Sequence, residues 1–278
     1  MDPGTLYLCA TPIGNLEDIT LRALRVLREV DLIAAEDTRR TRKLLAHYDI
    51  PTPLVSYHAH NRESRGKELL ARLRDGRSIA LVSDAGTPGV SDPGAALVAR
   101  AVAEGVPVVA IPGASAALTA LVVSGLPTAR FAFEGFLPRK GRAKVLAELA
   151  RETRTLVVFE SPRRVVHTLE ELLAVMGDRR VAVARELTKK FEEVFRGTLS
   201  EALAHFRERE PRGEFTLVIE GAVSGGAAEA CGQQDLRAAV EELVASGADR
   251  REAVKEVARR YGVPRRNVYN LTMKNSFK

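Results

Sequence analysis

The segment 78–113 constrains the fold most strongly, because its pattern predicts a single β-α-β unit. Apolar runs over 78–82 and 106–111 are typical of buried strands. A loop rich in Gly, Pro, Ser and Asp follows the first run, and then Asp92 and Pro93 signal a helix start as N-cap and first helical residue. Strands joined by a helical crossover run parallel, so both following loops emerge at one sheet edge, where α/β sheets bind ligands.

The same alternation of apolar runs and helical patterns continues on both sides of this unit. It predicts a doubly wound α/β domain over 1–125 and a second α/β domain over 126–221 that completes a cleft. Segment 222–232 has the small and polar composition of a linker. Three short helical patterns follow in 233–278, and we expect them to form a small helix-turn-helix-like module.

Positive charge is concentrated at the end of the chain. The net charge of the protein is +6, and segment 249–278 alone carries nine Lys and Arg against three acidic residues. Interleaved tyrosines favour nucleic-acid binding there over protein docking, which stays an alternative. The candidate RNA contacts in this module and in the second α/β domain are Arg259, Arg260, Arg265, Arg266, Arg139, Lys140, Arg142 and Arg163.

Several other classes of protein are disfavoured by the sequence. There is neither a signal peptide nor an apolar run long enough to span a membrane, so we expect a cytoplasmic protein without a membrane partner. Cys9 and Cys231 lack the spacing of a disulfide framework or a zinc site. His58 and His60 lack companion ligands, so no metal is expected.

The glycine patterns that cradle phosphates are missing from this sequence. Neither G-x-G-x-x-G nor G-x-x-x-x-G-K-[ST] follows an expected strand, which disfavours dinucleotides and nucleoside triphosphates. A ligand held by Pro-rich loops without a glycine nest is expected to lack phosphates. S-adenosylmethionine, with its adenine, ribose, amino acid and cationic sulfonium, meets that description.

Several motifs together resemble one known family. LVSDAGTPGVSDPG followed by VVAIPGASA resembles the tetrapyrrole methylase (class III) family of S-adenosylmethionine-dependent methyltransferases. TPIGNLEDITLRAL, AAEDTRRT, SYHAHN, FESPRR, RELTKKFEEVFRGT and GEFTLVIEG resemble its members that methylate ribosomal RNA. The resemblance implies S-adenosylmethionine as cofactor and the 2′-hydroxyl of a cytidine in small-subunit (16S) ribosomal RNA as target. It also implies a homodimer, acting on the RNA or on the assembled small subunit.

The resemblance also assigns cofactor contacts by their position in the motifs. These are Pro12, Asp84, Gly86, Thr87, Val90, Ser115, Ala116, Glu160, Ala184 and Gly213. Thr87 stands where many members of the family carry Asp, so a carboxylate contact would have to come from neighbouring Asp84.

Three carboxylates are candidate general bases for methyl transfer to a hydroxyl. Asp37 and Glu160 each follow an expected strand, one in each α/β domain, and Glu36 is the neighbour of Asp37. A helix cap is the alternative interpretation of Asp37, because Asp is favoured at that position.

Two other functions are compatible with the sequence. Methylation of a tetrapyrrole such as a precorrin needs the same two α/β domains, but it leaves the basic C-terminal segment without a role. A non-enzymatic, cofactor-sensing nucleic-acid-binding protein would bind S-adenosylmethionine without transferring its methyl group.

Overall fold

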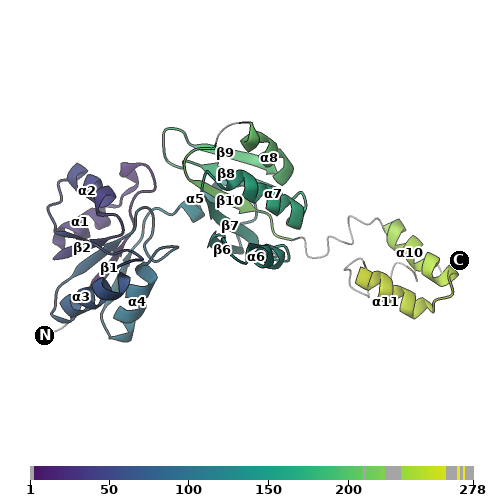
Figure 1. The fold of residues 1–278 in the computed structure, drawn as a ribbon, viewed down its shortest axis with the longest axis horizontal. Helices are drawn as coiled ribbons and strands as arrows, with labels where there is room; N and C mark the ends of the chain where they lie inside the picture. The colour runs from purple at the N-terminus through teal and green to yellow at the C-terminus, as the bar shows by residue number, and fades with distance from the viewer. Residues whose placement is uncertain (1–2, 209–210, 223–232, 261–267, 270–271, 273–278) are drawn as a thin grey trace. The chain divides into compact units, whose positions relative to one another are not determined.

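The computed structural model describes residues 3–208, 211–222, 233–260, 268–269 and 272. The chain divides into two compact units, Met1–Glu220 and Gly221–Lys278 (Figure 1). The first unit contains two five-stranded sheets, so both expected α/β domains lie within it.

The first sheet is wholly parallel, in the order β3-β2-β4-β1-β5. Its strands are β1 (Leu6–Cys9), β2 (Leu32–Ala35), β3 (Leu54–Ser56), β4 (Ile79–Val82) and β5 (Val108–Ile111). One face packs on α1 (Leu21–Glu29) and α2 (Thr38–His47), the other on α3 (Arg62–Arg74) and α4 (Gly94–Ala103). Helices on both faces of a parallel sheet confirm the doubly wound α/β fold that the sequence predicts.

The central β-α-β unit forms, with differences at the start of its helix and at its second strand. Helix α4 begins at Gly94 with Pro93 as its N-cap, one residue later than the expected cap at Asp92. All four residues of β4 are buried, and the side chain of Asp92 accepts the backbone N–H of Gly94 at the start of α4. β5 begins at Val108 and pairs only with β1 within the described sheet, so it is an edge strand. Its Val108, Val109 and Ala110 are half-buried or exposed, and only its last residue, Ile111, is buried. The prediction of a buried strand over 106–111 is therefore wrong for the middle of this range, although Val106 and Ile111 are buried. An apolar run alone does not distinguish an edge strand from a central one.

The second sheet is mixed, in the order β6-β7-β10-β8-β9. Its strands are β6 (Phe131–Phe136), β7 (Thr155–Glu160), β8 (Arg180–Arg185), β9 (Glu193–Thr198) and β10 (Phe215–Ile219), and only the pair β6–β7 is parallel. One face carries α6 (Arg142–Leu149), α7 (Val165–Met176) and α8 (Leu199–Arg207). The other face packs on α5 (Ala116–Val123), the helix that follows β5.

Helix α5 thereby connects the two halves of the first unit. Ala117, Ala120 and Leu121 of α5 share one core with Val157, Ala182 and Val218 of the second sheet.

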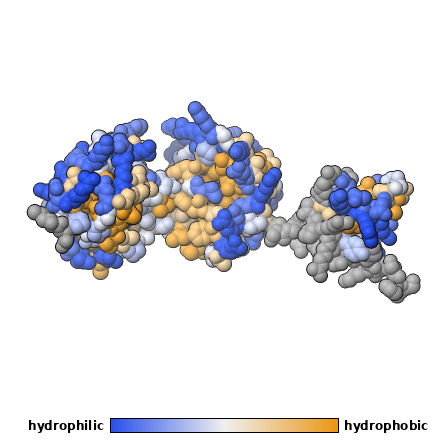
Figure 2. Space-filling view, turned by 90° about the horizontal axis from the view of Figure 1, so that it is seen from below, coloured by the Kyte–Doolittle hydropathy of each residue, from blue (hydrophilic) through white to orange (hydrophobic). Residues whose placement is uncertain are grey.

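In a space-filling view, hydrophilic residues cover much of the part that holds the first sheet, and hydrophobic residues gather on the visible face of the part that holds the second (Figure 2).

The second unit contains α10 (Gln233–Ala245) and α11 (Arg250–Arg260). Its core is formed by apolar residues of both helices with Val268. Arg265 and Arg266 of the expected RNA-binding hairpin, and most of the expected linker, lie outside the described residues. Among the helices that the structure describes, none has the length and hydropathy needed to span a membrane.

Candidate active site

A cavity of about 410 Å³ lies between the edges of the two sheets in the first unit. Residues that follow β2, β4 and β5 line it on one side, and residues from β7, β8 and β10 line it on the other. Its size is in the range of pockets that take cofactors and drug-sized molecules. The parallel sheet thus meets the cavity at the carboxyl ends of its strands, as expected for a doubly wound sheet.

The loop after β4 forms a rigid wall of this cavity. Thr11 and Gly86 exchange two backbone hydrogen bonds, of 2.9 and 3.0 Å, so the loop after β1 supports the loop after β4. Gly86 has φ +77°, a left-handed conformation that glycine adopts without strain. The second carboxylate oxygen of Asp92 accepts the backbone N–H of Gly89 at 2.7 Å. Asp92 therefore fastens both the loop and the helix that follows it.

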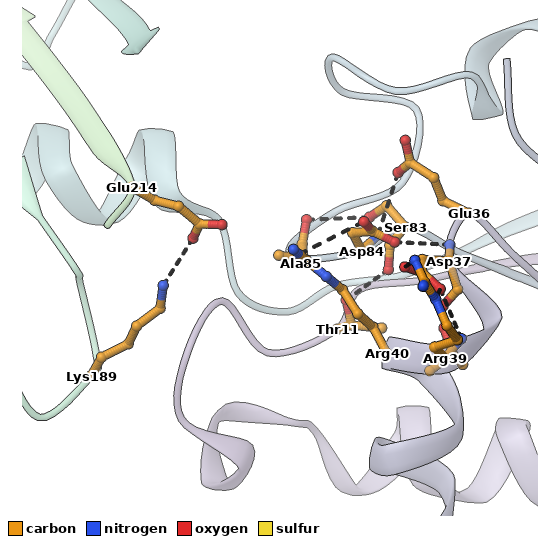
Figure 3. A network of polar contacts seen from close by, with 11 residues as sticks. Thr11, Glu36, Asp37, Arg39, Arg40, Ser83, Asp84, Ala85, Lys189 and Glu214 are labelled. Atoms are coloured by element: carbon orange, nitrogen blue, oxygen red, sulfur yellow. Dashed lines mark hydrogen bonds and ion pairs between the residues drawn. The ribbon is translucent and has the colours of Figure 1, made fainter. Parts of the chain in front are cut away.

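Carboxylates gather on the side of the cavity formed by the first sheet. Asp84 follows β4, and its Oδ1 accepts the backbone N–H of Asp37 at 2.9 Å (Figure 3). The backbone N–H of Asp84 in turn donates to Glu36 Oε2 at 3.5 Å, and Arg40 Nη1 lies 3.7 Å from Asp84 Oδ2. Glu36, Asp84 and Arg40 line the cavity, whereas Asp37 does not.

The environment changes the pKa values of these acids in opposite directions. Partial burial, and then the neighbouring negative charge of Asp84, raise the pKa of Glu36 above its usual value. Burial likewise raises the pKa of Asp92, against the effect of the backbone N–H groups that it accepts. The pKa of Asp37 is lowered to about 2, mainly by the hydrogen bonds it accepts from the Arg39 side chain and backbone. Of the two neighbouring carboxylates, Glu36 therefore binds a proton more tightly than Asp37 does.

The second half of the unit contributes to the cavity a loop held by ion pairs and the acidic residue Glu214. Lys189 Nζ pairs with Glu214 Oε2 at 3.0 Å (Figure 3). It also pairs with Glu186 Oε1 at 2.8 Å. The backbone N–H of Glu186 donates to the carbonyl oxygen of Glu214. These bonds fix the loop after β8, whose Leu187 lines the cavity together with Glu214.

Glu160 borders the cavity, but its fully buried side chain is engaged by protein groups. Its Oε1 accepts the backbone N–H of Ser161 at 2.8 Å, and its Oε2 accepts the hydroxyl of Thr168 at 2.7 Å. Arg164 Nη2 and Arg142 Nη2 lie 3.4 and 3.7 Å from Oε2. This geometry favours a structural role for Glu160, and it favours Glu36 among the three candidate bases.

The structure brings most of the expected cofactor contacts together. The cavity is lined by Asp84, Gly86, Thr87, Val90, Ser115, Ala116, Glu160 and Ala184. Pro12 and Gly213 do not line it, although each is adjacent in sequence to a lining residue, Ile13 and Glu214.

One candidate RNA contact is placed differently from the expectation. Arg142 begins α6 with a side chain only 11% exposed, and its Nε donates to Glu171 Oε2 at 2.5 Å. Its Nη2 donates to the hydroxyl of Thr168. Arg142 is therefore a buried structural cation and not a surface contact, because the helix directs it inward while Arg139, Lys140 and Arg163 stay exposed.

We expect Arg142→Ala to lower the free energy of unfolding by roughly 3 to 5 kcal/mol, because it leaves buried Glu160 short of a cation. Arg139→Ala is the matched control, since Arg139 is exposed in the same segment, and its effect should stay under about 0.5 kcal/mol. Urea unfolding of both variants measures the difference. Equal and small effects would contradict the structural role of Arg142.

Sequence reasoning missed several lining residues. The cavity also contains Ile13, Arg40, Ser83, Ala85, Ser91, Asp92, Phe136, Phe159, Ser161, Pro162, Leu187, Glu214, Phe215 and Thr216. Some of these residues directly follow an expected strand or an expected cofactor contact. Their position in the sequence could therefore have identified them as lining residues. Phe136 gave no such signal, because an apolar residue beside a glycine does not show which face of a strand it will occupy.

The residues present fit S-adenosylmethionine. Glu36, Asp84, Asp92 and Glu214 bring negative charge to the cavity, and Arg40 is the cation among the lining residues that the structure describes. Acidic walls complement a sulfonium and an ammonium group and disfavour phosphates. Val90 and Phe159 add apolar surface on which a planar base can pack. No group of three or more potential metal ligands occurs among the residues described.

The family model for Tetrapyrrole (Corrin/Porphyrin) Methylases matches residues 5–203. The Ribosomal RNA small subunit methyltransferase I of Halalkalibacterium halodurans is 53% identical, over 97% of this chain and 95% of the relative. The protein of the same name from Bacillus subtilis is 48% identical, over 97% and 94% of the two chains. The one from Thermotoga maritima is 52% identical over 78% of this chain and 99% of its own, so it is about as long as the first unit.

Solved structures agree with the fold. Uroporphyrin-III C-methyl transferase from Thermus thermophilus, complexed with S-adenyl homocysteine, is 26% identical and superimposes with a TM-score of 0.56, over 77% of this chain and 97% of that one. Diphthine synthase reaches a TM-score of 0.61 at 18% identity, over 78% and 90% of the chains.

Proposed function

The chain belongs to the tetrapyrrole methylase family, and from this premise we propose that it methylates the ribose 2′-hydroxyl of a cytidine in small-subunit (16S) ribosomal RNA. The methyl donor is S-adenosylmethionine. The observation that carries the proposal is the identity of 46 to 53% with relatives named for methylation of this RNA.

The cavity supports a division of labour between the two halves of the first unit. When bound, S-adenosylmethionine supplies an electrophilic methyl group. The loop after β4, with Asp84 and Thr87, and the start of α5, with Ser115, would hold the donor from one side. Glu214 would hold it from the other. Such positioning can account for ~7 to 11 kcal/mol of the barrier.

Glu36 would accept the proton of the ribose hydroxyl as the new bond forms. Its raised pKa supports this role, because a base works best when its pKa lies nearer the operating pH. Glu36 also lines the cavity, where the reacting oxygen must arrive.

Incubation with labelled S-adenosylmethionine and ribosomal particles from cells lacking the gene tests the function. We expect label in small-subunit RNA, at the ribose of one cytidine. Naked RNA and assembled subunits, supplied separately, tell which substrate is used. Tight cofactor binding with no transfer to either substrate would favour the cofactor-sensing alternative.

Methylation of a tetrapyrrole is a second candidate function, and a specific observation favours it. The chain is 26% identical to a uroporphyrin-III C-methyl transferase of the same fold. The higher identity to the ribosomal RNA relatives, over almost the full chain, supports RNA instead. A tetrapyrrole substrate in the same labelling assay distinguishes the two.

The basic C-terminal unit is proposed to bind RNA as a separable module, and the shorter Thermotoga maritima relative supports its separation from the catalytic unit. Replacing Arg259, Arg260, Arg265 and Arg266 by Gln should flatten the salt dependence of RNA binding by roughly three units, at about 0.7 for each phosphate that is no longer neutralised. Affinity for S-adenosylmethionine should stay the same. An unchanged salt slope would favour protein docking by this unit.

A homodimer remains part of the proposal. Its support in the chain is the pair of exposed apolar side chains Leu118 and Val122, one turn apart on α5. Light scattering of the purified protein measures the oligomeric state.

A further inference from the structure

Phe136 is an aromatic side chain at the rim of the cavity that nothing in the fold requires to be there. It lines the cavity and is 56% exposed. Large apolar side chains in this unit are mostly buried, so an exposed ring beside a ligand cavity points to a binding role.

A β-bulge directs this ring to the cavity. The parallel pairing of β6 with β7 is regular up to Phe133, which lies opposite Val157. The register then shifts before Gly135, so that Glu134 is the extra residue and Phe136 lies opposite Phe159.

Without the bulge, Phe136 would occupy the opposite face of the sheet. Side chains alternate along a strand, so a regular β6 would place Phe136 on the face of Ala132, which packs against α6, α7 and α8. The extra residue places it on the face of Phe133 and Phe159 instead. Bulges next to active sites often re-aim a side chain in this way.

The ring of Phe136 is held in place by contacts with neighbouring aromatic side chains. The ring centroids of Phe136 and Phe159 are 5.6 Å apart, and those of Phe159 and Phe133 are 5.0 Å apart in an edge-to-face contact. Gly135 has φ +60°, and a Cβ there would lie 2.6 Å from the Oγ of Ser91, which also lines the cavity. A ring fixed in this way loses little freedom when a planar group stacks on it.

Unpaired cations follow Phe136 in the sequence. Arg139 and Lys140 are exposed, and neither has an ion pair with any residue that the structure describes. The cavity itself is acidic, so phosphates would be held outside it. An exposed ring next to exposed cations is the combination with which proteins bind single-stranded nucleic acids.

We propose that Phe136 is the stacking platform for the target nucleobase of the RNA substrate, with Arg139 and Lys140 holding the neighbouring phosphates. This rests on the proposed function, since it takes RNA as the substrate. A base drawn out of its strand and stacked at the rim brings its own ribose to the mouth of the cavity.

The test compares Phe136→Ala, Phe136→Leu and Phe136→Tyr with the parent enzyme. We expect Phe136→Ala to lower kcat/KM for the RNA substrate roughly 5- to 150-fold, the range for loss of one base–aromatic stack. Phe136→Tyr should retain most of the rate, and Phe136→Leu should not, although it keeps the apolar bulk. Phe191→Ala is the matched control, because Phe191 is 67% exposed and lies outside the cavity lining.

A second readout separates this inference from the proposed function. An RNA oligonucleotide with the fluorescent base pyrrolocytosine at the target position should be quenched by the parent protein and not by Phe136→Ala. If the parent transfers no methyl group to RNA, the proposed function fails, while the quenching still decides the role of Phe136. The absence of quenching in the parent, or equal quenching by Phe136→Ala, would overturn the inference.

Two further outcomes would also overturn it. A large loss of S-adenosylmethionine affinity in Phe136→Ala, measured by calorimetry, would assign the ring to the cofactor. A changed oligomeric state in light scattering would assign it to a contact between two copies of the chain.

Discussion

Thr87→Arg is expected to abolish binding of S-adenosylmethionine, with an affinity loss of more than about 1000-fold, or ~4 kcal/mol. Thr87 lies in the cavity wall, and its hydroxyl donates to the carbonyl oxygen of Ala114 at 3.3 Å. A guanidinium at this position would fill part of a cavity of about 410 Å³ and would repel the cationic sulfonium. Both effects act on the ligand and neither acts on the sheet core.

Calorimetry with purified protein measures this loss. Thr128→Arg is the matched control, because Thr128 is exposed and does not line the cavity. If Thr87→Arg lowers the melting temperature, Val90→Arg replaces it, since Val90 is a lining residue that is already 45% exposed. Full affinity in both variants would show that the donor binds elsewhere.

Glu36→Gln is expected to lower the single-turnover methylation rate by about 10²- to 10⁴-fold, the usual contribution of a general base. Cofactor affinity should change much less, because Asp84 and Glu214 still line the cavity. The parent rate should rise with pH through the raised pKa of Glu36, since only the ionised carboxylate accepts a proton. The variant should lose that limb of the pH profile.

The same substitution should make the folded protein more stable at neutral pH. A carboxyl group whose pKa is raised by folding binds its proton more tightly in the folded state, so its ionisation destabilises the fold as pH rises through the raised pKa. A neutral Gln removes this cost. A lower rate with a higher melting temperature would therefore identify Glu36 as a functional residue that destabilises the fold.

Asp37→Asn is the matched control for Glu36→Gln. Asp37 is the N-cap of α2, where Asn serves nearly as well, and it does not line the cavity. Its lowered pKa means that it stabilises the fold at neutral pH and loses this effect only as pH falls toward about 2. A rate loss in Asp37→Asn as large as in Glu36→Gln would move the base to Asp37.

Local signals in the sequence predicted the parts of the fold that depend on local chemistry. The β-α-β unit around Asp92 could be predicted because capping, glycine breaks and apolar runs act within a few residues. The placement of both following loops at one sheet edge could be predicted because strands joined by a helical crossover run parallel. Most of the cofactor contacts then fell on the cavity because they follow strands of one sheet.

The remaining features depend on contacts between distant segments. Arg142 belongs to a basic run that resembles a solvent-exposed segment, and only its bonds to Thr168 and Glu171, more than 20 residues away, show that it is buried. Glu160 could not be distinguished from a general base either, because its engagement by Thr168 and Arg142 is seen only in the folded structure. The bulge in β6 shifts the strand's alternation by one residue, and Gly135 alone does not reveal it.

The acidic lining of the cavity has a consequence for turnover. Methyl transfer converts a positively charged sulfonium into a neutral thioether. The spent cofactor therefore keeps the attraction of its ammonium group to Glu36, Asp84 and Glu214 but loses that of the sulfonium. The carboxylates that help to capture the donor therefore do not hold its product with the same strength. The acidic wall thus favours replacement of the demethylated cofactor by S-adenosylmethionine. This preference should weaken as ionic strength rises.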